Sequence, residues 1–522
     1  MRTHHRFRIA ITTAATGMLL ISAAQAQIAL TEVGSYSSGV FGESAAEIVA
    51  YHAETRRAFV VNAAASAIDV LDLNDPATPT LLFSIDVTRH GDSPNSVAVH
   101  GDLVAVAVQA DPKTDPGAGV FFDVDGNFLA AFTAGALPDM ITFSPNGRYV
   151  LIANEGEPDD DYVIDPRGSV TLIDLRRGLT NAIVTQIGFE GFDRLPWLLR
   201  LKGVRIFGPN ALPSQDLEPE YITVTPDSRR AFVVMQENNA IVTIDLRRGR
   251  VTDIFGLGVR HHARSGNGID ASDRDDDINI RRWPVFGLPL PDSIATYRHR
   301  NRTYIVTANE GDSRDYDGFA EEARIGDLEL DARIFPNAAE LQMDENIGRL
   351  KVTNTLGDIA GNGDFEALSS FGTRSFSIYT DRGRLVYDSR DDFEQISAQA
   401  LPDDFNSNND ENDSLDSRSD DKGPEPEALA IGSIEGRVYA FIGLERIGGI
   451  MVYDITNPNR VRFVEYVNNR DFQGDPESGT AGDLGPESIL FVPADESPLN
   501  VPLMIVANEV SGTTTVWRID PR

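Results

Sequence analysis

Short aliphatic runs recur along the chain, each bounded by turn residues. In the fullest copy, residues 137–156 (LPDMITFSPNGRYVLIANEG), a proline and an acidic residue precede an apolar run, a turn and a second aliphatic run that ends in Ala-Asn-Glu. Residues 218–238 (EPEYITVTPDSRRAFVVMQEN) follow the same order. Runs rich in Val and Ile that are separated by Pro, Asn, Asp and Gly are typical of β-hairpins. The pattern therefore predicts a repeated hairpin and an all-β fold.

Seven copies of this unit follow one another. They lie at residues 45–64, 93–111, 137–156, 218–238, 290–311, 425–446 and 485–509. In most copies a third run ending in Asp follows, as in GSVTLIDLRRG at 168–178. Seven consecutive antiparallel units without linkers predict a seven-bladed β-propeller. An array of β-sandwiches is the structural alternative.

The irregular spacing of the units indicates insertions, and the two ends of the repeat region indicate how the ring closes. Several blades carry insertions, many of them acidic, of which the largest span residues 190–215, 256–284, 315–365 and 388–422. The last unit ends in TTTVWRID at 513–520 with no fourth run after it, whereas a spare run, IALTEV at 28–33, precedes the first unit. We expect this N-terminal run to supply the outer strand of the last blade. Residues 27–522 would then form a single propeller domain.

The first 26 residues have the pattern of a secretory signal peptide. A basic stretch, MRTHHRFR, precedes an apolar stretch, and AQA at 24–26 supplies the small residues required for cleavage. We expect cleavage after Ala26 and a periplasmic or secreted protein. No later apolar stretch is long enough to span a membrane.

Most of the seven units place an acidic residue at the entrance to the first strand. The equivalent positions are Glu47, Asn95, Asp139, Glu220, Asp292, Glu427 and Glu487. The first strand of a propeller blade lines the central channel, so these residues should form a ring at its mouth. They can be read as ordinary turn residues, but Glu has little preference for turns. Carboxylates brought together in this way repel one another unless cations or protons intervene. We therefore expect the six acidic members to bind a metal ion.

The Ala-Asn-Glu phrase provides a second set of polar residues. Because the second strand runs antiparallel to the first, its end should reach the same mouth. We expect a ligand-binding role for Asn154, Glu155, Glu237, Asn309, Glu310, Glu445, Arg446, Asn508 and Glu509. The simpler interpretation, that Asn-Glu-Gly is only a useful turn, explains the Gly but not the Glu.

Oxygen ligands without Cys or paired His favour Ca²⁺ or Mg²⁺ over zinc, and many oxygens from flexible loops favour Ca²⁺. Two acidic insertions, at 266–280 and 404–423, also place oxygen side chains at short intervals. Neither has the Gly and Glu positions of an EF-hand loop. For these two segments a solvated, partly mobile loop is the simpler expectation.

Charge and composition narrow the class of protein. The formal net charge is −34, so nucleic acid and anionic membranes are not expected partners. The chain has no cysteine, which excludes disulfides and thiolate chemistry. It also lacks GxSxG, HExxH and the GK dipeptide of phosphate-binding loops. We expect a monomer.

Several long phrases resemble the choice-of-anchor I family of exported bacterial proteins. They include ANEGDSRDYDGFAEEAR, NGIDASDRDDDINI, RSFSIYTDRGRLVYDSRDDFE and YAFIGLERIGGIMVYDITNP, and the resemblance extends over essentially the whole mature chain. It implies a propeller-like domain that is attached to varied C-terminal anchors. This chain stops at Arg522 without a sorting signal or hydrophobic tail, which favours a free form.

Two functions follow from these expectations. The first is an exported ligand-binding propeller with an acidic, calcium-binding mouth and without an identified catalytic motif. The alternative comes from the resemblance, because some relatives carry alkaline-phosphatase-like or phytase-like labels. In that case the protein would be a calcium-dependent phosphoesterase, in which Arg314, Arg418, Lys422 or Arg446 holds phosphate.

Overall fold

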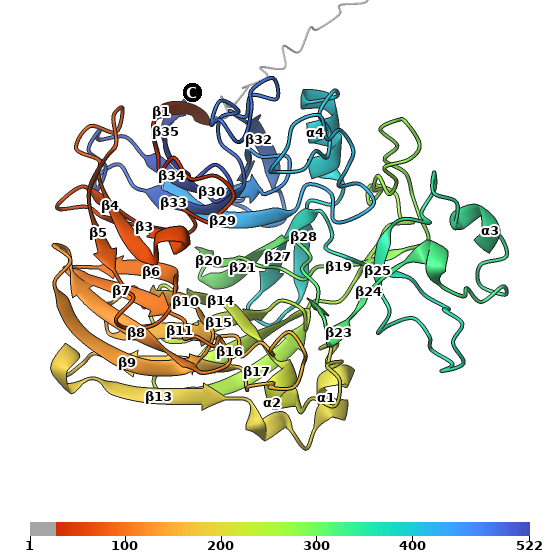
Figure 1. The fold of residues 1–522 in the computed structure, drawn as a ribbon, viewed down its shortest axis with the longest axis horizontal. Helices are drawn as coiled ribbons and strands as arrows, with labels where there is room; N and C mark the ends of the chain where they lie inside the picture. The colour runs from red at the N-terminus through yellow and green to blue at the C-terminus, as the bar shows by residue number, and fades with distance from the viewer. Residues whose placement is uncertain (1–27) are drawn as a thin grey trace, which may run out of the picture.

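Seven four-stranded antiparallel sheets surround a common centre in the computed structural model, which describes residues 28–522 (Figure 1). The expected signal peptide lies outside the described residues. The sheets form a β-propeller, as the repeated units predict, and the alternative of separate sandwiches is wrong. In the described part of the chain, no helix is long and apolar enough to span a membrane.

The first four blades use consecutive strands. Blade 1 contains β2 (Val49–His52), β3 (Arg57–Asn62), β4 (Ala67–Asp72) and β5 (Thr80–Asp86). Blade 2 contains β6 (Pro94–His100), β7 (Leu103–Val108), β8 (Pro116–Asp123) and β9 (Phe128–Ala136). Blade 3 contains β10 (Pro138–Phe143), β11 (Tyr149–Asn154), β12 (Ser169–Asp174) and β13 (Ile183–Gly188). Blade 4 contains β14 (Pro219–Val224), β15 (Arg230–Met235), β16 (Ala240–Asp245) and β17 (Arg250–Gly256).

The last three blades include one interrupted sheet and one closed by the N-terminus. Blade 5 contains β20 (Ile294–His299), β21 (Arg302–Asn309), β27 (Ser375–Thr380) and β28 (Leu385–Asp388). Blade 6 contains β29 (Pro426–Ile434), β30 (Arg437–Leu444), β31 (Ile450–Asp454) and β32 (Arg462–Val467). Blade 7 contains β33 (Pro486–Val492), β34 (Leu503–Asn508), β35 (Thr513–Pro521) and β1 (Ile28–Ser37).

The N-terminal strand closes the ring, as expected. β1 pairs antiparallel with β35, from Ile28 opposite Pro521 to Ser37 opposite Thr513, and is longer than the predicted run. Ile28 and Leu30 are buried against blades 6 and 7. Pairing the first strand with the last covers the edge of β35 and completes the four strands of blade 7.

The second strand of each blade carries a run of consecutive apolar residues because both of its faces are covered. In β15, Ala231, Val233 and Met235 pack toward blade 3, whereas Phe232 and Val234 pack toward blade 5. All five side chains are fully buried. This arrangement explains the continuous aliphatic runs in the sequence, since a strand that is exposed on one face would alternate polar and apolar residues.

The hairpin turns follow from their residues. In the turn of blade 3, Gly147 has a φ of 66°, and its amide donates to the Ser144 carbonyl at 2.8 Å. The Ser144 hydroxyl accepts a hydrogen bond from the Tyr149 amide at 2.9 Å. Gly adopts this left-handed conformation without a steric penalty.

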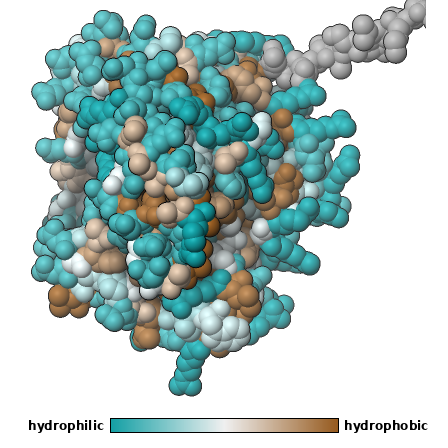
Figure 2. Space-filling view, turned by 90° about the vertical axis from the view of Figure 1, so that its right-hand side faces the viewer, coloured by the Kyte–Doolittle hydropathy of each residue, from teal (hydrophilic) through white to brown (hydrophobic). Residues whose placement is uncertain are grey.

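The insertions lie where the irregular spacing predicts, but two of them build a sheet that the sequence did not indicate. Five short strands lie beside the ring in the order β18-β19-β26-β25-β24 (Figure 1). They are β18 (Arg260–His261), β19 (Phe286–Leu288), β24 (Glu322–Arg324), β25 (Lys351–Thr353) and β26 (Ser369–Phe371). β22 (Asp315–Tyr316) and β23 (Phe319–Ala320) form a separate hairpin. Figure 2 shows mainly hydrophilic side chains on this side, with small hydrophobic areas.

The remaining elements are short helices. Within residues 28–522, the α-helices are α1 (Pro196–Leu201), α2 (Pro213–Asp216), α3 (Ala338–Leu341) and α4 (Asp392–Ala400). The 3-10 helices are η1 (Ala63–Ala65), η2 (Leu179–Asn181), η3 (Glu190–Phe192) and η4 (Ile325–Asp327).

The segment 404–423 differs from the solvated loop that its composition suggests. Asn406 and Ser419 are fully buried. The Asn406 amide donates to Glu394 Oε1 of α4 at 3.1 Å and to Ser419 Oγ at 2.8 Å. The expectation is wrong for the buried part of this segment, where the Asn406 amide donates to Ser419 and to α4 rather than to water.

Candidate functional site

The acidic residue that opens an inner strand lies in a β-bulge in several blades. The pairing register shifts between Pro138 and Ile141 in blade 3 and between Pro219 and Ile222 in blade 4. Blades 2, 6 and 7 have the same irregularity at their first proline. A bulge redirects a side chain and ends regular pairing. The Pro-acid step of the repeat therefore turns the acidic side chain out of the blade at the mouth.

The backbone before these prolines is strained. Leu137, Leu290 and Glu425 each precede a proline and have φ values of 45°, 41° and 49°. A left-handed conformation is costly for a residue with a side chain, and a following proline restricts the residue further. Strain of this kind persists only where the surrounding structure fixes it, and such positions cluster at functional sites.

The ring expected from the sequence forms at the centre of the propeller. A cavity of about 140 Å³ is lined by Glu47, Asn95, Asp139, Glu220, Asp292 and Glu487. The seventh member, Glu427, lies with Asp292 and Glu310 in an adjoining cluster. Burial raises the pKa of Glu47 to about 8, and the nearby Glu509 adds to the shift.

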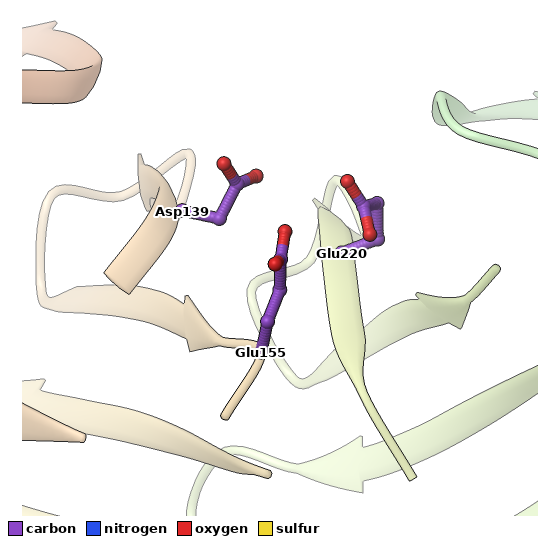
Figure 3. Close-up of side chains that lie close together, drawn as sticks. All are labelled: Asp139, Glu155 and Glu220. Atoms are coloured by element: carbon purple, nitrogen blue, oxygen red, sulfur yellow. The ribbon is translucent and has the colours of Figure 1, made fainter. Parts of the chain in front are cut away.

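Asp139, Glu155 and Glu220 bring their carboxylates together between blades 3 and 4 (Figure 3). We call them the central triad. Asp139 comes from β10, Glu155 follows β11, and Glu220 comes from β14. One oxygen of each lies within 4.8 Å of one oxygen of the other two. This spacing allows all three to bind one cation with ordinary calcium–oxygen distances.

The central triad has no counter-cation within residues 28–522. Among residues 28–522, no side chain donates a hydrogen bond to any of its carboxylates or forms an ion pair with them. Burial, followed by repulsion from Glu157, raises the pKa of Asp139 to about 7. Burial and the surrounding carboxylates raise the pKa of Glu155 and Glu220 well above its usual range. The ionised triad is therefore unstable unless a cation or protons balance it.

A second acidic cluster, formed by Asp292, Glu310 and Glu427, is partly balanced. Glu310 Oε1 accepts a hydrogen bond from Lys422 Nζ at 2.8 Å, and Oε2 accepts one from Gln236 Nε2 at 2.7 Å. Asp292 accepts a hydrogen bond from the Ser293 hydroxyl at 3.2 Å. This cluster needs an added cation less than the central triad does.

A third cluster, formed by Glu310, Glu425 and Glu445, is surrounded by cations. Glu425 lies 2.6 Å from Arg418 NH2, 3.0 Å from Lys422 Nζ and 3.1 Å from Arg446 Nε. Burial alone would raise the pKa of Glu425, but these three cations lower it below its usual range. The cluster forms a nearly neutral ion network.

Arg314 is engaged by carboxylates in the same way. Its side chain is almost completely buried, and its NH2 group lies 2.6 Å from Glu218 Oε2. Its NH1 group pairs with Asp216 of α2. All four cations expected to hold phosphate are therefore already in ion pairs.

The asparagines of the repeated phrase bond within their own blades. Asn154 Nδ2 donates to Ser169 Oγ at 3.1 Å and to Thr171 Oγ1 at 3.0 Å. Asn309 Nδ2 donates to Ser377 Oγ at 2.9 Å, and Asn508 Nδ2 donates to Thr513 Oγ1 at 3.1 Å. These amides connect the second strand to the third, whereas the glutamate that follows reaches the mouth.

The other glutamates of this set lie around the mouth in different states. Burial raises the pKa of Glu237 to about 8, and its Oε2 atom is buried without a hydrogen-bond partner among the described residues. Glu509 accepts a hydrogen bond from the Ser44 hydroxyl at 2.8 Å. Glu445 accepts one from Asn409 Nδ2 at 2.9 Å.

Sequence reasoning missed Glu218 and Glu425, the buried glutamates that precede a proline in blades 4 and 6. The signal was present, because both stand in the phrase Glu-Pro-Glu. Only the second glutamate occupies the ring position that recurs in the other units. The first glutamate forms an ion pair with Arg314 in blade 4 and with Arg418 in blade 6.

Comparison with known proteins gives two curated relatives. The mesenchyme-specific cell surface glycoprotein of Strongylocentrotus purpuratus is 29% identical over 324 residues, which are 53% of this chain and 41% of that protein. Gigasin-3a of Magallana gigas is 31% identical over 190 residues, which are 34% of this chain and 66% of that protein. The chain thus spans less than two thirds of the length of either relative.

Two solved structures are similar over nearly their whole length. They are Kuenenia stuttgartiensis hydrazine synthase, with a TM-score of 0.45 at 14% identity, and the β-propeller domain of Myceliophteria thermophila Cps50 (Swd1), with a TM-score of 0.45 at 8% identity. The matches cover 92% and 94% of this chain and 99% of each structure. The choice-of-anchor I domain matches residues 47–458, which is most of the chain. The protein therefore belongs to the choice-of-anchor I family.

Proposed function

We propose that this protein is an exported ligand-binding propeller whose mouth binds a divalent cation, Ca²⁺, at the central triad. The observation that carries this proposal is the contrast between the acidic clusters. Lys422, Arg418 and Arg446 balance the carboxylates around Glu310 and Glu425, whereas Asp139, Glu155 and Glu220 have no cation among the described residues. Buried like charges are stable only when they are compensated.

Calcium suits this site because every available ligand is an oxygen. Ca²⁺ takes six to eight oxygens, so three carboxylates leave coordination positions that face the cavity. Water or an oxygen of a ligand would fill these positions. The cation would thus serve as the contact point for a ligand that carries carboxylate, phosphate or vicinal hydroxyl groups.

Export is supported by the N-terminal signal-peptide pattern and by the name of the sea-urchin relative, a cell surface glycoprotein. The phosphoesterase alternative has less support. It assigns phosphate to Arg314, Arg418, Lys422 or Arg446, and each of these is held by carboxylates. A phosphate group would have to displace those partners.

Isothermal titration calorimetry of the chelator-treated protein with CaCl₂ tests the proposal. The variant Asp139→Asn/Glu220→Gln should lose a calcium site that the wild type has. The matched control is Asp292→Asn/Glu427→Gln, which removes the same two charges from the cluster that Lys422 balances, and it should keep the site. Absence of calcium binding by the wild type, or equal loss in both variants, would overturn the proposal. Calcium-dependent hydrolysis of p-nitrophenyl phosphate would instead support the alternative function, a calcium-dependent phosphoesterase.

A further inference from the structure

Arginines gather on the face of the propeller opposite the mouth. The mouth lies where the first strand of a blade begins and the second ends, so the turn between these strands lies on the other face. The turn between the third and fourth strands lies there as well. The turn between the first two strands of blades 4 and 5 and the turn between the third and fourth strands of blade 5 carry, with their flanking residues, Arg229, Arg230, Arg298, Arg300, Arg302, Arg382 and Arg384. We call this set the basic face.

Two carboxylates, Asp227 and Asp381, lie among the arginines of the basic face. Arg230 pairs with Asp381 at 3.0 Å. The other six are exposed, and none of them forms an ion pair with a residue in 28–522. Acidic residues outnumber basic ones by 80 to 46 in this chain, so six unpaired arginines on adjoining turns reverse the local sign of charge. A local field of this kind attracts anions even when the whole molecule is negative.

The basic face is hollowed rather than flat. One hollow of about 520 Å³ is lined by Arg302, Arg382 and Arg384 together with Thr303 and Thr380. A second, of about 240 Å³, is lined by Arg230, Arg298 and Arg302 together with Asn301. Arg302, Thr303 and Asp381 line both hollows, so the two adjoin across the turns of blades 4 and 5.

The chemistry of this face selects among anionic partners. An arginine guanidinium binds sulfate, phosphate or carboxylate through two parallel hydrogen bonds. The hydroxyls of Thr303 and Thr380 and the amide of Asn301 provide the neutral hydrogen-bonding groups that sugars need. Tyr304 is 7% exposed, and none of the residues that line the two hollows is an exposed large hydrophobic. The two hollows therefore lack the apolar side chains that insert into a bilayer.

We propose that the basic face binds an anionic polysaccharide through its sulfate, phosphate or carboxylate groups. Duplex DNA is disfavoured because its dense charge meets a protein with a net charge of −34. A polysaccharide with more widely spaced anionic groups can lie along the two hollows with less repulsion from the rest of the molecule. The site is independent of calcium at the mouth.

The test is binding to chondroitin sulfate, a sulfated polysaccharide, and to polygalacturonate, a carboxylated one, with EDTA present so that the central triad holds no metal. The test variant changes Arg298, Arg302 and Arg384 to Ser. The matched control changes three exposed arginines of the insertions, Arg194, Arg264 and Arg282, to Ser and alters net charge equally. The dissociation constant for at least one polysaccharide should rise on the order of tenfold or more in the test variant and change little in the control.

The salt dependence of the dissociation constant shows whether these three arginines contact the anionic groups of the polysaccharide. The test variant should also show a shallower slope of log Kd against log salt concentration than the wild type. Changing the same three arginines to Lys should preserve part of the affinity and report correct folding. Equal affinities of the test and control variants would overturn the proposal. Binding to duplex DNA or phosphatidylglycerol vesicles, but to neither polysaccharide, would overturn it as well.

Discussion

Glu155 and Glu310 occupy equivalent positions after β11 and β21, yet only Glu310 accepts a hydrogen bond from a lysine, Lys422 Nζ at 2.8 Å. Lys422 comes from the long insertion of blade 5, which reaches one side of the mouth. The repeat therefore places similar glutamates on both sides of the mouth. The insertion that carries Lys422 gives a cationic partner only to the side of Glu310.

Calcium should stabilise the folded protein through the central triad. A ligand that binds only the native state adds about 2.7 kcal/mol to the free energy of unfolding at a hundredfold excess over its dissociation constant. Thermal melts of the wild type in EGTA and in millimolar calcium should therefore differ by several degrees. The Glu155→Gln variant should show a much smaller difference. As a control, Glu445→Gln, in the cluster balanced by arginines, should retain it. Superimposable wild-type melts would contradict this prediction.

Without calcium, stability should fall as the pH rises. Burial raises the pKa of Asp139 to about 7 and that of Glu47 and Glu237 to about 8, so the folded state holds protons that the unfolded state releases near pH 4. The free energy of unfolding should decline between about pH 4 and pH 8 from these groups. Urea denaturation at stepped pH values in EGTA measures the slope. A stability that rises steadily over this interval would contradict the assignment. Calcium should reduce the decline because the cation replaces the protons.

Removing Arg314 should destabilise the protein strongly. Arg314→Ala leaves Asp216 and Glu218 buried without their cation, a change that typically costs about 3–5 kcal/mol. Adding Glu218→Gln should recover part of this loss because it removes one uncompensated charge. Urea midpoints of the two single variants and the double variant give the coupling. Additive effects would show that the pair contributes no interaction energy.

The N-terminal strand should be required for a closed, monomeric ring. Deleting residues 28–33 removes most of the partner of β35 and exposes a strand edge, which promotes association. Size-exclusion chromatography and thermal melting should show oligomers and a lower Tm. For point variants, Leu30→Ala should cost about 2–3 kcal/mol, since Leu30 is buried, whereas Thr31→Ala at the exposed neighbouring position should have little effect. An unchanged Tm of the deletion variant would contradict the closure.

The sequence predicted the blades well because each blade is encoded locally. Aliphatic runs, turn residues and the Pro-acid step lie within one unit, and the spare run at 28–33 indicated how the ends meet. The added sheet was not predictable in the same way. β18 has two residues, β19 and β26 have three each, and the parallel pairing of β19 with β26 joins Phe286 to Ser369 across a long separation. Such short strands have no periodicity to recognise.

The site was predicted only as a set of positions. The ring follows from equivalent positions in the repeat. Which of its carboxylates form ion pairs, however, depends on cationic side chains such as Lys422, which belong to insertions far away in the sequence. The Ala-Asn-Glu phrase also combined two roles that a sequence cannot separate. Asn154 bonds inside the blade, and Glu155 faces the mouth. Likewise, the net charge of −34 concealed the arginines that gather over blades 4 and 5.

The pairing of β1 with β35 also sets the order in which the molecule can be completed. β1 is synthesised first of all the strands, yet its partner is synthesised last, so β1 must wait while the other blades form. The delay is kinetic rather than thermodynamic, because the entropy of closing a loop grows only with the logarithm of its length. Until β35 arrives, β1 is available to any other strand edge. The ring is therefore most vulnerable to misassembly just before its last strand is added.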